Sequence, residues 1–312
     1  MSLSTPSSHF NLTQNPLAMS ALRKTIVATG VTSGLGFEAI KHLLVQPQPY
    51  RFILGARNVP VAQAAFEGIG FDKSTHALTV LPLDLVDLKG VKTFAQQTLE
   101  TLGQDKLDYL CLNAGVVKPN DQPGPHGSKW SEPLIVNHFA QHYLIHLLRE
   151  KLVESKARIV VVSSGAIRNV PDTSVLDKEL LANSGTPAFV NYAQTKFVQL
   201  LGAHWWRRQL KGQCDVVAVS PGLIPGTGLG RHSDFKLPAD MPDAKPVEEG
   251  GTNILRAFFR DDFPEDPNQI FLTSWGEWWG TDVYPTSLDK DLQDKWCPSK
   301  EEIENSQGIM AP

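Results

Sequence analysis

The sequence predicts an α/β fold, in which a single domain is built on a doubly wound parallel sheet of about seven strands with helices on both faces. Short, β-branched apolar runs alternate with amphipathic helical runs along most of the 312 residues. That alternation is typical of strands joined by helical crossovers, which make a sheet parallel. Small and polar residues follow several of the strand-like runs, and ligands bind at this carboxyl edge of such sheets.

The first strand and helix are predicted over 24–29 and up to about Val45, with a glycine-rich turn between them. Gly30, Gly34 and Gly36 let backbone N–H groups approach an anion, and the positive end of the helix dipole points to the same place. The G-x-x-x-G-x-G spacing differs from the common fingerprint, and a turn without a ligand would read the same way. In this kind of fold the usual ligand of such a turn is a dinucleotide pyrophosphate.

The second strand, 51–55, ends beside Arg57 and Asn58. In a βαβ unit this strand end lies next to the adenosine ribose, where an acidic residue would favour NAD. The guanidinium of Arg57 suits a 2′-phosphate instead and can stack on adenine. We therefore predict NADP(H) as the cofactor; the alternative is that Arg57 is a solvated surface residue.

A helix near 60–68 and a third strand near 77–83 come next, followed by Asp84 and Leu85. Asp84 lies at the carboxyl end of its strand, where its carboxylate can accept a hydrogen bond from the adenine amino group. It can equally cap the helix predicted over 87–102, and the sequence does not decide between these roles.

The fourth strand, 107–112, is apolar and ends in Asn113, Ala114 and Gly115. An Asn at a strand end can join neighbouring strands through its amide group. The two small residues after it leave room for a cofactor ring, so this strand end is predicted to face the ligand.

A long helix is predicted over 132–152, with Asn137 on its inner side. His138, His142 and His146 recur every four residues, so they share one face of that helix. They are accompanied by neither an HExxH pattern nor a nearby acid. We therefore predict that they pack in an interface or groove, and we predict no metal site.

The fifth strand, 158–162, runs into Ser163 and Ser164, and an irregular segment separates it from the next helix. That helix is predicted over 192–210, and it opens with Tyr192 and Lys196, which are four residues apart and share one face. The remaining elements are a strand over 214–219 that ends before Pro221, Gly222 and Ile224, a flexible stretch over 225–245, a helix near 247–260 and a last strand near 269–273.

Composition narrows the range of functions. The chain is 41% hydrophobic and 20% charged with a net charge of −4, which offers no basic footprint for nucleic acid. No apolar run is long enough to cross a bilayer, and three widely spaced cysteines are typical of a reducing compartment, so a cytoplasmic location is predicted. We expect a flexible arm over 1–22, the main domain over 23–275, and an extension over 276–312 packed on it.

Taken together, these motifs resemble the short-chain dehydrogenase/reductase family, which has the Rossmann fold. The ordered set is T-G-V-T-S-G-L-G from Thr29, N-A-G from Asn113, then Asn137, Ser164, Tyr192 with Lys196, and Pro221-Gly222. The A-R-N after the second strand is similar to a branch that includes retinol-dehydrogenase-like and protochlorophyllide-reductase-like enzymes, which use NADP(H).

The resemblance implies a catalytic tetrad of Asn137, Ser164, Tyr192 and Lys196. In it, Tyr192 is the general acid/base, and the Lys196 ammonium lowers the pKa of its phenol and binds the nicotinamide ribose. Ser164 hydrogen-bonds the substrate oxygen, and Asn137 holds a water that links Lys196 to solvent. The residues implied in cofactor binding are Gly30, Thr32, Ser33, Gly34, Leu35, Gly36, Arg57, Asn58, Asp84, Leu85, Asn113, Ala114, Gly115, Tyr192, Lys196, Pro221, Gly222, Ile224 and Thr227.

The sequence departs from the family pattern at three points. Leu112 replaces the first Asn of the common N-N-A-G, and the interval between Ser164 and Tyr192 is longer than in many members. Gly226 stands where many members have a Thr, so Thr227 is predicted to take its place. Ser163 could be mistaken for the catalytic serine; the second Ser after the strand, Ser164, is preferred.

The expected function is that of an NADP(H)-dependent oxidoreductase that interconverts a ketone or aldehyde and an alcohol. The substrate is expected to be small and apolar or aromatic, of the kind found in secondary metabolism. The alternative is a non-redox NADP-binding protein that acts as a sensor, scaffold, or cyclisation or isomerisation aid. In the family the two long helices, here 132–152 and 192–210, often pair between subunits, so a homodimer through them is a further expectation.

Overall fold

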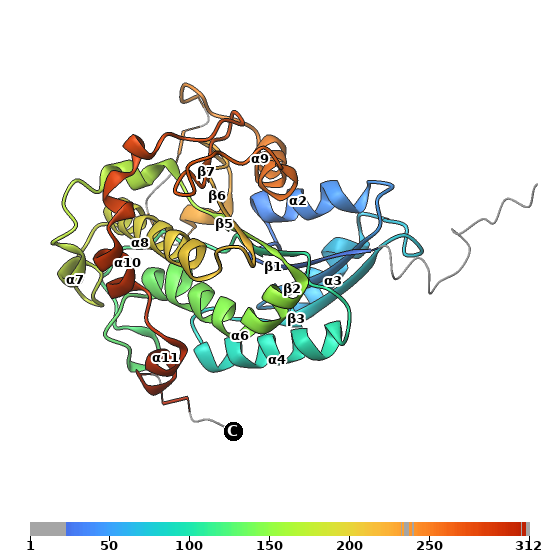
Figure 1. The fold of residues 1–312 in the computed structure, drawn as a ribbon, viewed down its shortest axis with the longest axis horizontal. Helices are drawn as coiled ribbons and strands as arrows, with labels where there is room; N and C mark the ends of the chain where they lie inside the picture. Colours follow the sequence, from blue (N-terminus) through green and yellow to red (C-terminus); the bar gives the residue numbers. More distant parts are fainter. Residues whose placement is uncertain (1–22, 232, 234–236, 239, 307, 310–312) are drawn as a thin grey trace, which may run out of the picture.

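In a computed structural model of the chain, seven parallel strands form one sheet in the order β3-β2-β1-β4-β5-β6-β7 (Figure 1). The structure describes residues 23–231, 233, 237–238, 240–306 and 308–309, so the arm predicted over 1–22 lies outside the described residues. The predicted α/β fold with a doubly wound parallel sheet is confirmed. The strands are β1 (Lys24–Thr29), β2 (Tyr50–Ala56), β3 (Ala77–Pro82), β4 (Tyr109–Leu112), β5 (Arg158–Val162), β6 (Asp215–Val219) and β7 (Phe271–Leu272).

The order of the strands reverses at β1, which pairs with β2 on one side and with β4 on the other. Crossovers therefore leave β1 and β4 in opposite directions, and a crevice opens between the carboxyl ends of these two strands. Thr29 ends β1 opposite Leu112 of β4, so the glycine-rich turn and Asn113 begin side by side at this crevice.

Helices cover both faces of the sheet and bury two separate apolar clusters against it. One face carries α2 (Gly34–Leu44), α3 (Val59–Glu67) and α9 (Val247–Phe259). The opposite face carries α4 (Leu88–Leu102), α6 (Ala140–Ser155) and α8 (Ala188–Gln209), as Figure 1 shows. The strands read as nearly continuous apolar runs because both of their faces are covered.

Three predicted elements differ in the structure. The helix expected from Tyr192 begins at Ala188, where the main-chain N–H of Asn191 bonds the carbonyl of Pro187 at 2.9 Å. The helix expected over 132–152 has three parts: α5 (Glu132–Leu134), a π-helical segment (Ile135–Phe139) and α6. The last strand is only two residues long, because Thr273 turns into a hairpin and bonds Glu277 instead of the sheet.

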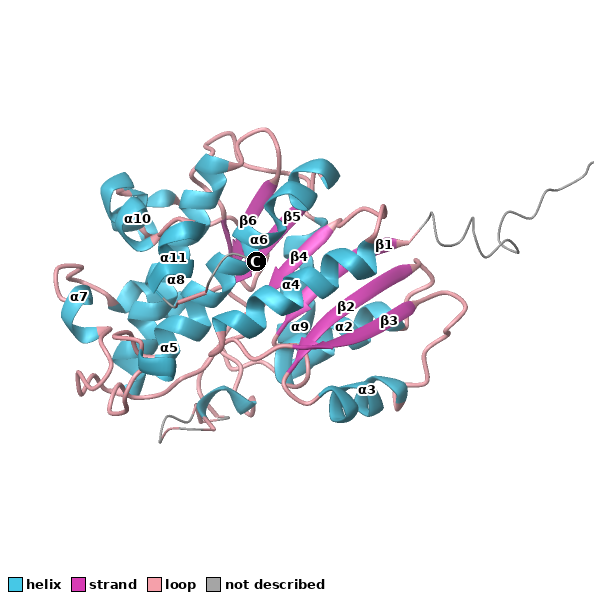
Figure 2. Cartoon of the chain, turned by 90° about the horizontal axis from the view of Figure 1, so that it is seen from below, coloured by secondary structure: helices cyan, strands magenta, loops and turns pink. Residues whose placement is uncertain are grey.

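The chain after β7 returns across the helical layer. Short helices α10 (Lys290–Trp296) and α11 (Lys300–Ser306) follow it, and Figure 2 shows them on the side of the molecule away from β3. There α10 contacts α8 and α11 contacts α6. A further short helix, α7 (Leu176–Glu179), lies in the segment between β5 and α8. Among the described residues, no helix combines the length and the apolar character that a membrane span requires.

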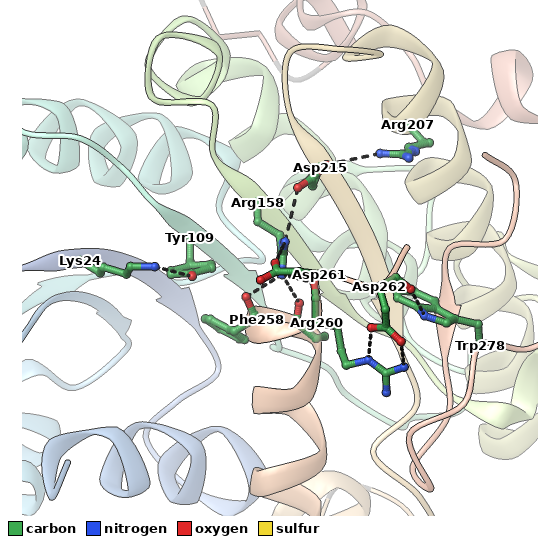
Figure 3. A network of polar contacts seen from close by, with 11 residues as sticks. Lys24, Tyr109, Arg158, Arg207, Asp215, Phe258, Arg260, Asp261, Asp262 and Trp278 are labelled. Atoms are coloured by element: carbon green, nitrogen blue, oxygen red, sulfur yellow. Dashed lines mark hydrogen bonds and ion pairs between the residues drawn. The ribbon is translucent and has the colours of Figure 1, made fainter. Parts of the chain in front are cut away.

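At the amino end of β5, Arg158 joins the sheet to the chain that follows α9 (Figure 3). Its guanidinium donates to the carbonyl of Phe258 at 2.7 Å and forms an ion pair with Asp261 at 3.1 Å. Asp215, at the start of β6, lies 3.5 Å away. This network fixes the edge of the sheet opposite the ligand crevice.

Candidate active site

A cavity of about 1120 Å³ lies at the carboxyl edge of the sheet, and every strand end of the sheet contributes to its lining. It includes the crevice between β1 and β4. Most of the predicted residues line it: Gly30, Thr32, Ser33, Gly34, Leu35, Arg57, Asp84, Leu85, Asn113, Ala114, Gly115, Ser164, Tyr192, Lys196, Pro221, Gly222, Ile224 and Thr227.

The glycine-rich turn packs directly against the end of β4. A Cβ atom on Gly30 would lie 2.4 Å from the Cα of Ala114, and the φ of Gly30 is +66°, so only glycine fits here. Asn113 donates from Nδ2 to the carbonyl of Gly30 at 2.6 Å, which joins the two strand ends as predicted for an Asn at this position. The single Asn that remains beside Leu112 therefore fixes the turn.

Three predicted residues do not line the cavity: Gly36, Asn58 and Asn137. Gly36 serves packing, because a Cβ there would lie 2.4 Å from Nδ2 of Asn113 and 2.5 Å from the carbonyl oxygen of Gly30. The side chain of Asn58 caps α3 by accepting from the N–H of Val61 at 3.2 Å. Its oxygen is thus committed to the helix rather than to a ligand.

The two roles left open for Asp84 are resolved in part. Helix α4 is capped by Asp87, which accepts from the N–H of Lys89 at 3.0 Å, so Asp84 is not the cap. Asp84 accepts from the N–H of Val86 at 3.2 Å and lines the cavity. That position leaves the adenine-binding role as the interpretation of Asp84.

The nucleotide half of the cavity fits a dinucleotide phosphate. The side chain of Ser33 makes no capping bond, so the first N–H groups of the eleven-residue helix α2 have no side-chain acceptor. Thr227 lies over the turn, with its Cβ 3.7 Å from where a Cβ of Gly34 would be, and its replacement of a Thr at position 226 stays a prediction. Arg57 is exposed on the lining, and within the described part of the chain it forms no ion pair.

Tyr192 and Lys196 project from α8 into the same buried place. Tyr192 is 8% exposed and Lys196 is 3% exposed, and the ammonium lies 5.9 Å from the centre of the phenol ring. Burial raises the pKa of Tyr192, and a hydrogen bond with Ser164 lowers it. Ser164 also accepts from the N–H of Ala166 at 3.2 Å, whereas the buried hydroxyl of Ser163 has no partner within the described structure. The contact with Tyr192 distinguishes Ser164 from Ser163.

Lys196 is held by two acceptors. Its ammonium donates to the carbonyl of Val162 at 2.8 Å and to Oε1 of Gln199 at 3.1 Å. Burial lowers the pKa of Lys196 to about 7, because the charged form is poorly solvated there. An ammonium has three N–H bonds, so one of them is left for a ligand on the cavity side. Gln199 was not among the predicted site residues. Its position one helical turn after Lys196 is the sequence feature that could have identified it as a partner of the ammonium.

Asn137 lies behind the cavity with all of its side chain buried, in the π-helical segment. Its Oδ1 accepts from the N–H of Val116 at 2.8 Å. Its Nδ2 donates to the carbonyl of Val116 at 3.0 Å and to the hydroxyl of Thr195 at 2.9 Å. The amide is thus bonded to protein atoms at both ends, where the expected role was to hold a water.

The histidine row packs inside the molecule, under the chain near its C-terminus. His138 bonds the carbonyl of Trp296 at 2.7 Å, and His142 bonds the carbonyl of Pro298 at 2.9 Å. Trp206 of α8 donates to the other nitrogen of His142 at 2.9 Å. The described residues contain no cluster of three or more His, Cys, Asp or Glu side chains suited to a metal ion.

The wall beyond Ser164 contains residues outside the predicted set of site residues. Arg168 and Asn169 come from the short helical turn after β5, Phe189 from the first turn of α8, and Trp275 and Trp279 from the hairpin after β7. Arg168 could have been found from its position, because it comes only four residues after Ser164. No local pattern in the sequence places the two tryptophans at the cavity.

Comparisons with known proteins agree with this geometry. The family model described as short chain dehydrogenase matches residues 24–175. A short-chain dehydrogenase/reductase of Pestalotiopsis microspora is 59% identical over 286 residues, which span 91% of this chain and 98% of that protein. Human retinol dehydrogenase 11 is 32% identical over 216 residues, which span 68% of this chain and 64% of that protein.

Solved structures share the fold at lower identity. NADPH-bound carbonyl reductase from chicken fatty liver superposes with a TM-score of 0.63 at 21% identity, over 83% of this chain and 95% of that one. An alcohol dehydrogenase from the archaeon Thermococcus sibiricus, complexed with 5-hydroxy-NADP, gives a TM-score of 0.61 at 18% identity, over 80% and 95% of the two chains.

Proposed function

The chain belongs to the short-chain dehydrogenase/reductase family of oxidoreductases, and from this we propose that it uses NADP(H) to interconvert a ketone or aldehyde and an alcohol. The observation that supports this most is the buried Tyr192, hydrogen-bonded with Ser164 and one helical turn from Lys196, in the cavity that the glycine-rich turn lines. The substrate we propose is a small apolar or aromatic carbonyl compound.

The nucleotide would be held by groups already in place. The turn from Gly30 to Leu35 would take the pyrophosphate, and Arg57 would take the 2′-phosphate. The free N–H of Lys196 would take a ribose hydroxyl, and main-chain atoms near Ile224 would take the carboxamide. When bound, the nicotinamide supplies or accepts the hydride. Solved relatives that carry NADPH or an NADP derivative support this choice of cofactor.

The side chains perform the proton chemistry. In reduction Tyr192 gives its hydroxyl proton to the carbonyl oxygen of the substrate, and in oxidation it takes that proton back. Ser164 donates a hydrogen bond to the same oxygen as negative charge develops. The charged form of Lys196, whose ammonium lies 5.9 Å from the centre of the Tyr192 ring, would stabilise the phenolate by attraction.

The test is NADPH oxidation with a panel of aliphatic and aromatic aldehydes and ketones, followed in parallel for Tyr192→Phe. We expect the variant to lose about 10²- to 10⁴-fold in kcat/KM, because the general acid is removed. Its Kd for NADPH should change far less than kcat/KM does, since the proposed loss is that of the proton donor to the substrate oxygen. Full activity in the variant would contradict the mechanism. Tight NADPH binding with no turnover of any carbonyl would support the non-redox alternative.

A further inference from the structure

An arginine and a tryptophan flank the residue that follows Ser164. The guanidinium of Arg168 lies 5.2 Å from the ring centre of Trp279, and its Nε donates to the carbonyl of Gly165 at 3.2 Å. A Cβ atom on Gly165 would lie 3.5 Å from Cη2 of Trp279 and 3.6 Å from Nη2 of Arg168. The two side chains thus form one wall of the cavity, immediately beside the serine proposed to contact the substrate oxygen.

Two tryptophans give that wall an aromatic surface, part of which is exposed to solvent. Trp279 is fixed by its main-chain bond to the carbonyl of Phe271 at 2.9 Å and by stacking on the Phe271 ring at 4.9 Å. The ring of Trp275 lies edge-to-face with Trp279, with their centres 6.2 Å apart. Trp275 is 60% exposed, and its N–H is bonded to Glu277 at 3.0 Å. An exposed aromatic ring at the rim of a cavity is typical of a surface that a ligand covers.

The hairpin that carries Trp275 is held in place from behind. The N–H of Thr273 bonds the carbonyl of Glu277 at 2.9 Å, which closes the hairpin. Arg260 bonds the carbonyl of Gly276 and forms an ion pair with Asp262. The indole N–H of Trp278 also donates a hydrogen bond to the main-chain carbonyl of Asp262 at 3.0 Å (Figure 3). The aromatic platform is therefore preorganised, which reduces the entropy that a ligand must overcome on binding.

Among the residues that the structure describes, Arg168 has no carboxylate partner. None of the ion pairs in the described part of the chain includes its guanidinium, and its one side-chain hydrogen bond uses Nε. The glutamates of the cavity lining are each near a lysine: Glu132 lies 2.6 Å from Lys118 and Glu249 lies 3.8 Å from Lys245. The terminal N–H groups of Arg168 thus remain able to bind an anionic oxygen from outside the chain.

We infer that Arg168, Trp279 and Trp275 form a substrate subsite that selects planar aromatic carbonyl compounds bearing an anionic oxygen, either a carboxylate or an ionised phenol. The aromatic rings stack on or against the substrate, and Arg168 pairs with its anionic group. Arg168 is a specificity-determining residue in this assignment, which rests on the proposed carbonyl reduction. The proton and hydride chemistry is unchanged.

Turnover tests this with benzaldehydes that differ in one substituent, and each variant is compared with the wild type on the same substrate. NADPH oxidation is measured with 4-carboxybenzaldehyde, 4-hydroxybenzaldehyde and the neutral 4-methylbenzaldehyde, for the wild type, Arg168→Gln and Arg149→Gln. The last is the matched control, because Arg149 is exposed on α6 and does not line the cavity. Arg168→Gln should lose about 10- to 100-fold in kcat/KM on the charged substrate that the subsite accepts, and less than about threefold on the neutral one. Comparison of the carboxylate with the phenol, assayed above its pKa, identifies the oxygen.

A binding measurement shows whether the subsite or the proposed carbonyl reduction is at fault when turnover is not seen. Calorimetric titration of the NADP⁺-loaded protein with 2-naphthoate and with neutral 2-naphthamide requires no turnover. The wild type should bind naphthoate at least about tenfold more tightly, Arg168→Gln should lose that preference, and Trp275→Ala should weaken both probes by a similar factor. Equal affinity for the two probes, failure to bind either, or a preference that survives Arg168→Gln would each overturn the subsite. Charge-selective binding without NADPH oxidation would support the subsite and count against carbonyl reduction.

Discussion

At the scale of residues, the site brings together an acid and a base whose pKa values burial shifts in opposite directions. Burial raises the pKa of the Tyr192 phenol and lowers the pKa of the Lys196 ammonium to about 7. Both shifts favour the neutral forms, because a low-dielectric site solvates charge poorly. The hydrogen bond with Ser164 opposes the shift of Tyr192, so the serine contributes to the acidity of the phenol as well as to substrate binding.

The choice between cofactors is expected to depend on Arg57. Replacing it with Asp puts a carboxylate where the 2′-phosphate is expected, so the Kd of NADPH should rise about 10- to 100-fold while that of NADH changes less than about threefold. Nucleotide fluorescence titration measures both constants. Arg57→Lys serves as the control, since it keeps the charge and loses only the bidentate geometry. If NADPH and NADH are weakened equally, Arg57 does not contact the 2′-phosphate.

Local spacing predicted the residues whose role depends on local geometry. The spacing of four residues placed Tyr192 and Lys196 on one helix face, and Gly30 was predicted because a glycine lets backbone N–H groups approach an anion. The positive φ of Gly30 is a finding of the structure. Asn58 was assigned to the ligand, but its side chain was taken up by a nearer partner, the first turn of α3. Arg168 could not be assigned, because its environment is made by Trp279, more than a hundred residues later in the chain.

At the scale of elements, the π-helical segment sets how three elements meet. A π-helical turn rotates the following residues relative to an ordinary helix and is frequent at functional sites. Here it brings Asn137 between the end of β4 and α8, where the side chain bonds Val116 and Thr195. The segment therefore joins the strand end that borders the ligand crevice to the helix that carries Tyr192.

We expect Asn137→Ala to lower the free energy of unfolding by about 2 to 4 kcal/mol, because it leaves buried polar groups of Val116 without a partner. Activity should fall at the same time, since α8 and the end of β4 lose their shared anchor. Urea unfolding and NADPH oxidation measure the two effects. The control is Asn305→Ala on exposed surface, expected within about 0.5 kcal/mol of the wild type. An Asn137→Ala variant of unchanged stability would show that these bonds contribute little to folding.

The positions of most elements followed from hydrophobic periodicity, with bounds within a few residues of those observed. The start of α8 was missed because Ala188 and Phe189 follow Pro187 in a stretch that also reads as loop. The length of β7 was missed because its end depends on the bond between Thr273 and Glu277, which a strand-like composition does not reveal. In both cases a tertiary or turn interaction overrode the local pattern.

At the scale of the whole molecule, the segment from Thr281 to Ile309 covers the outer side of the helical layer. It contacts α8 through α10 and α6 through α11, and Glu304 bonds the hydroxyl of Tyr143 at 2.7 Å. Fifteen of the 22 residues of α8 are buried within one chain. The predicted pairing of these helices between subunits would require this segment to be displaced, so we propose that any subunit contact uses another surface.

The histidine row predicts that this packing is sensitive to acid. Burial lowers the pKa values of His138 and His146 to about 4, whereas an unfolded histidine titrates near 6.5. Between these values the unfolded chain binds more protons, so the stabilisation is fully present above about pH 6.5 and is lost as the pH falls through about 4. One such shift corresponds to about 3 kcal/mol.

Urea unfolding at intervals from pH 7.5 to pH 4.5 measures this loss. His138→Gln is the informative variant, because its amide can still donate to the carbonyl of Trp296 but cannot titrate. Its stability should decline less steeply with acid than that of the wild type. Identical slopes for the two proteins would show that His138 does not carry the pH dependence.

Helix α8 presents the chemistry on one side and receives the end of the chain on the other. Gly202 permits a close fit between α8 and the π-helical segment, since a Cβ there would lie 2.8 Å from the imidazole of His138, which in turn bonds the carbonyl of Trp296. Removal of the stretch from residue 281 onward would therefore take away the packing behind the helix that carries Tyr192 and Lys196.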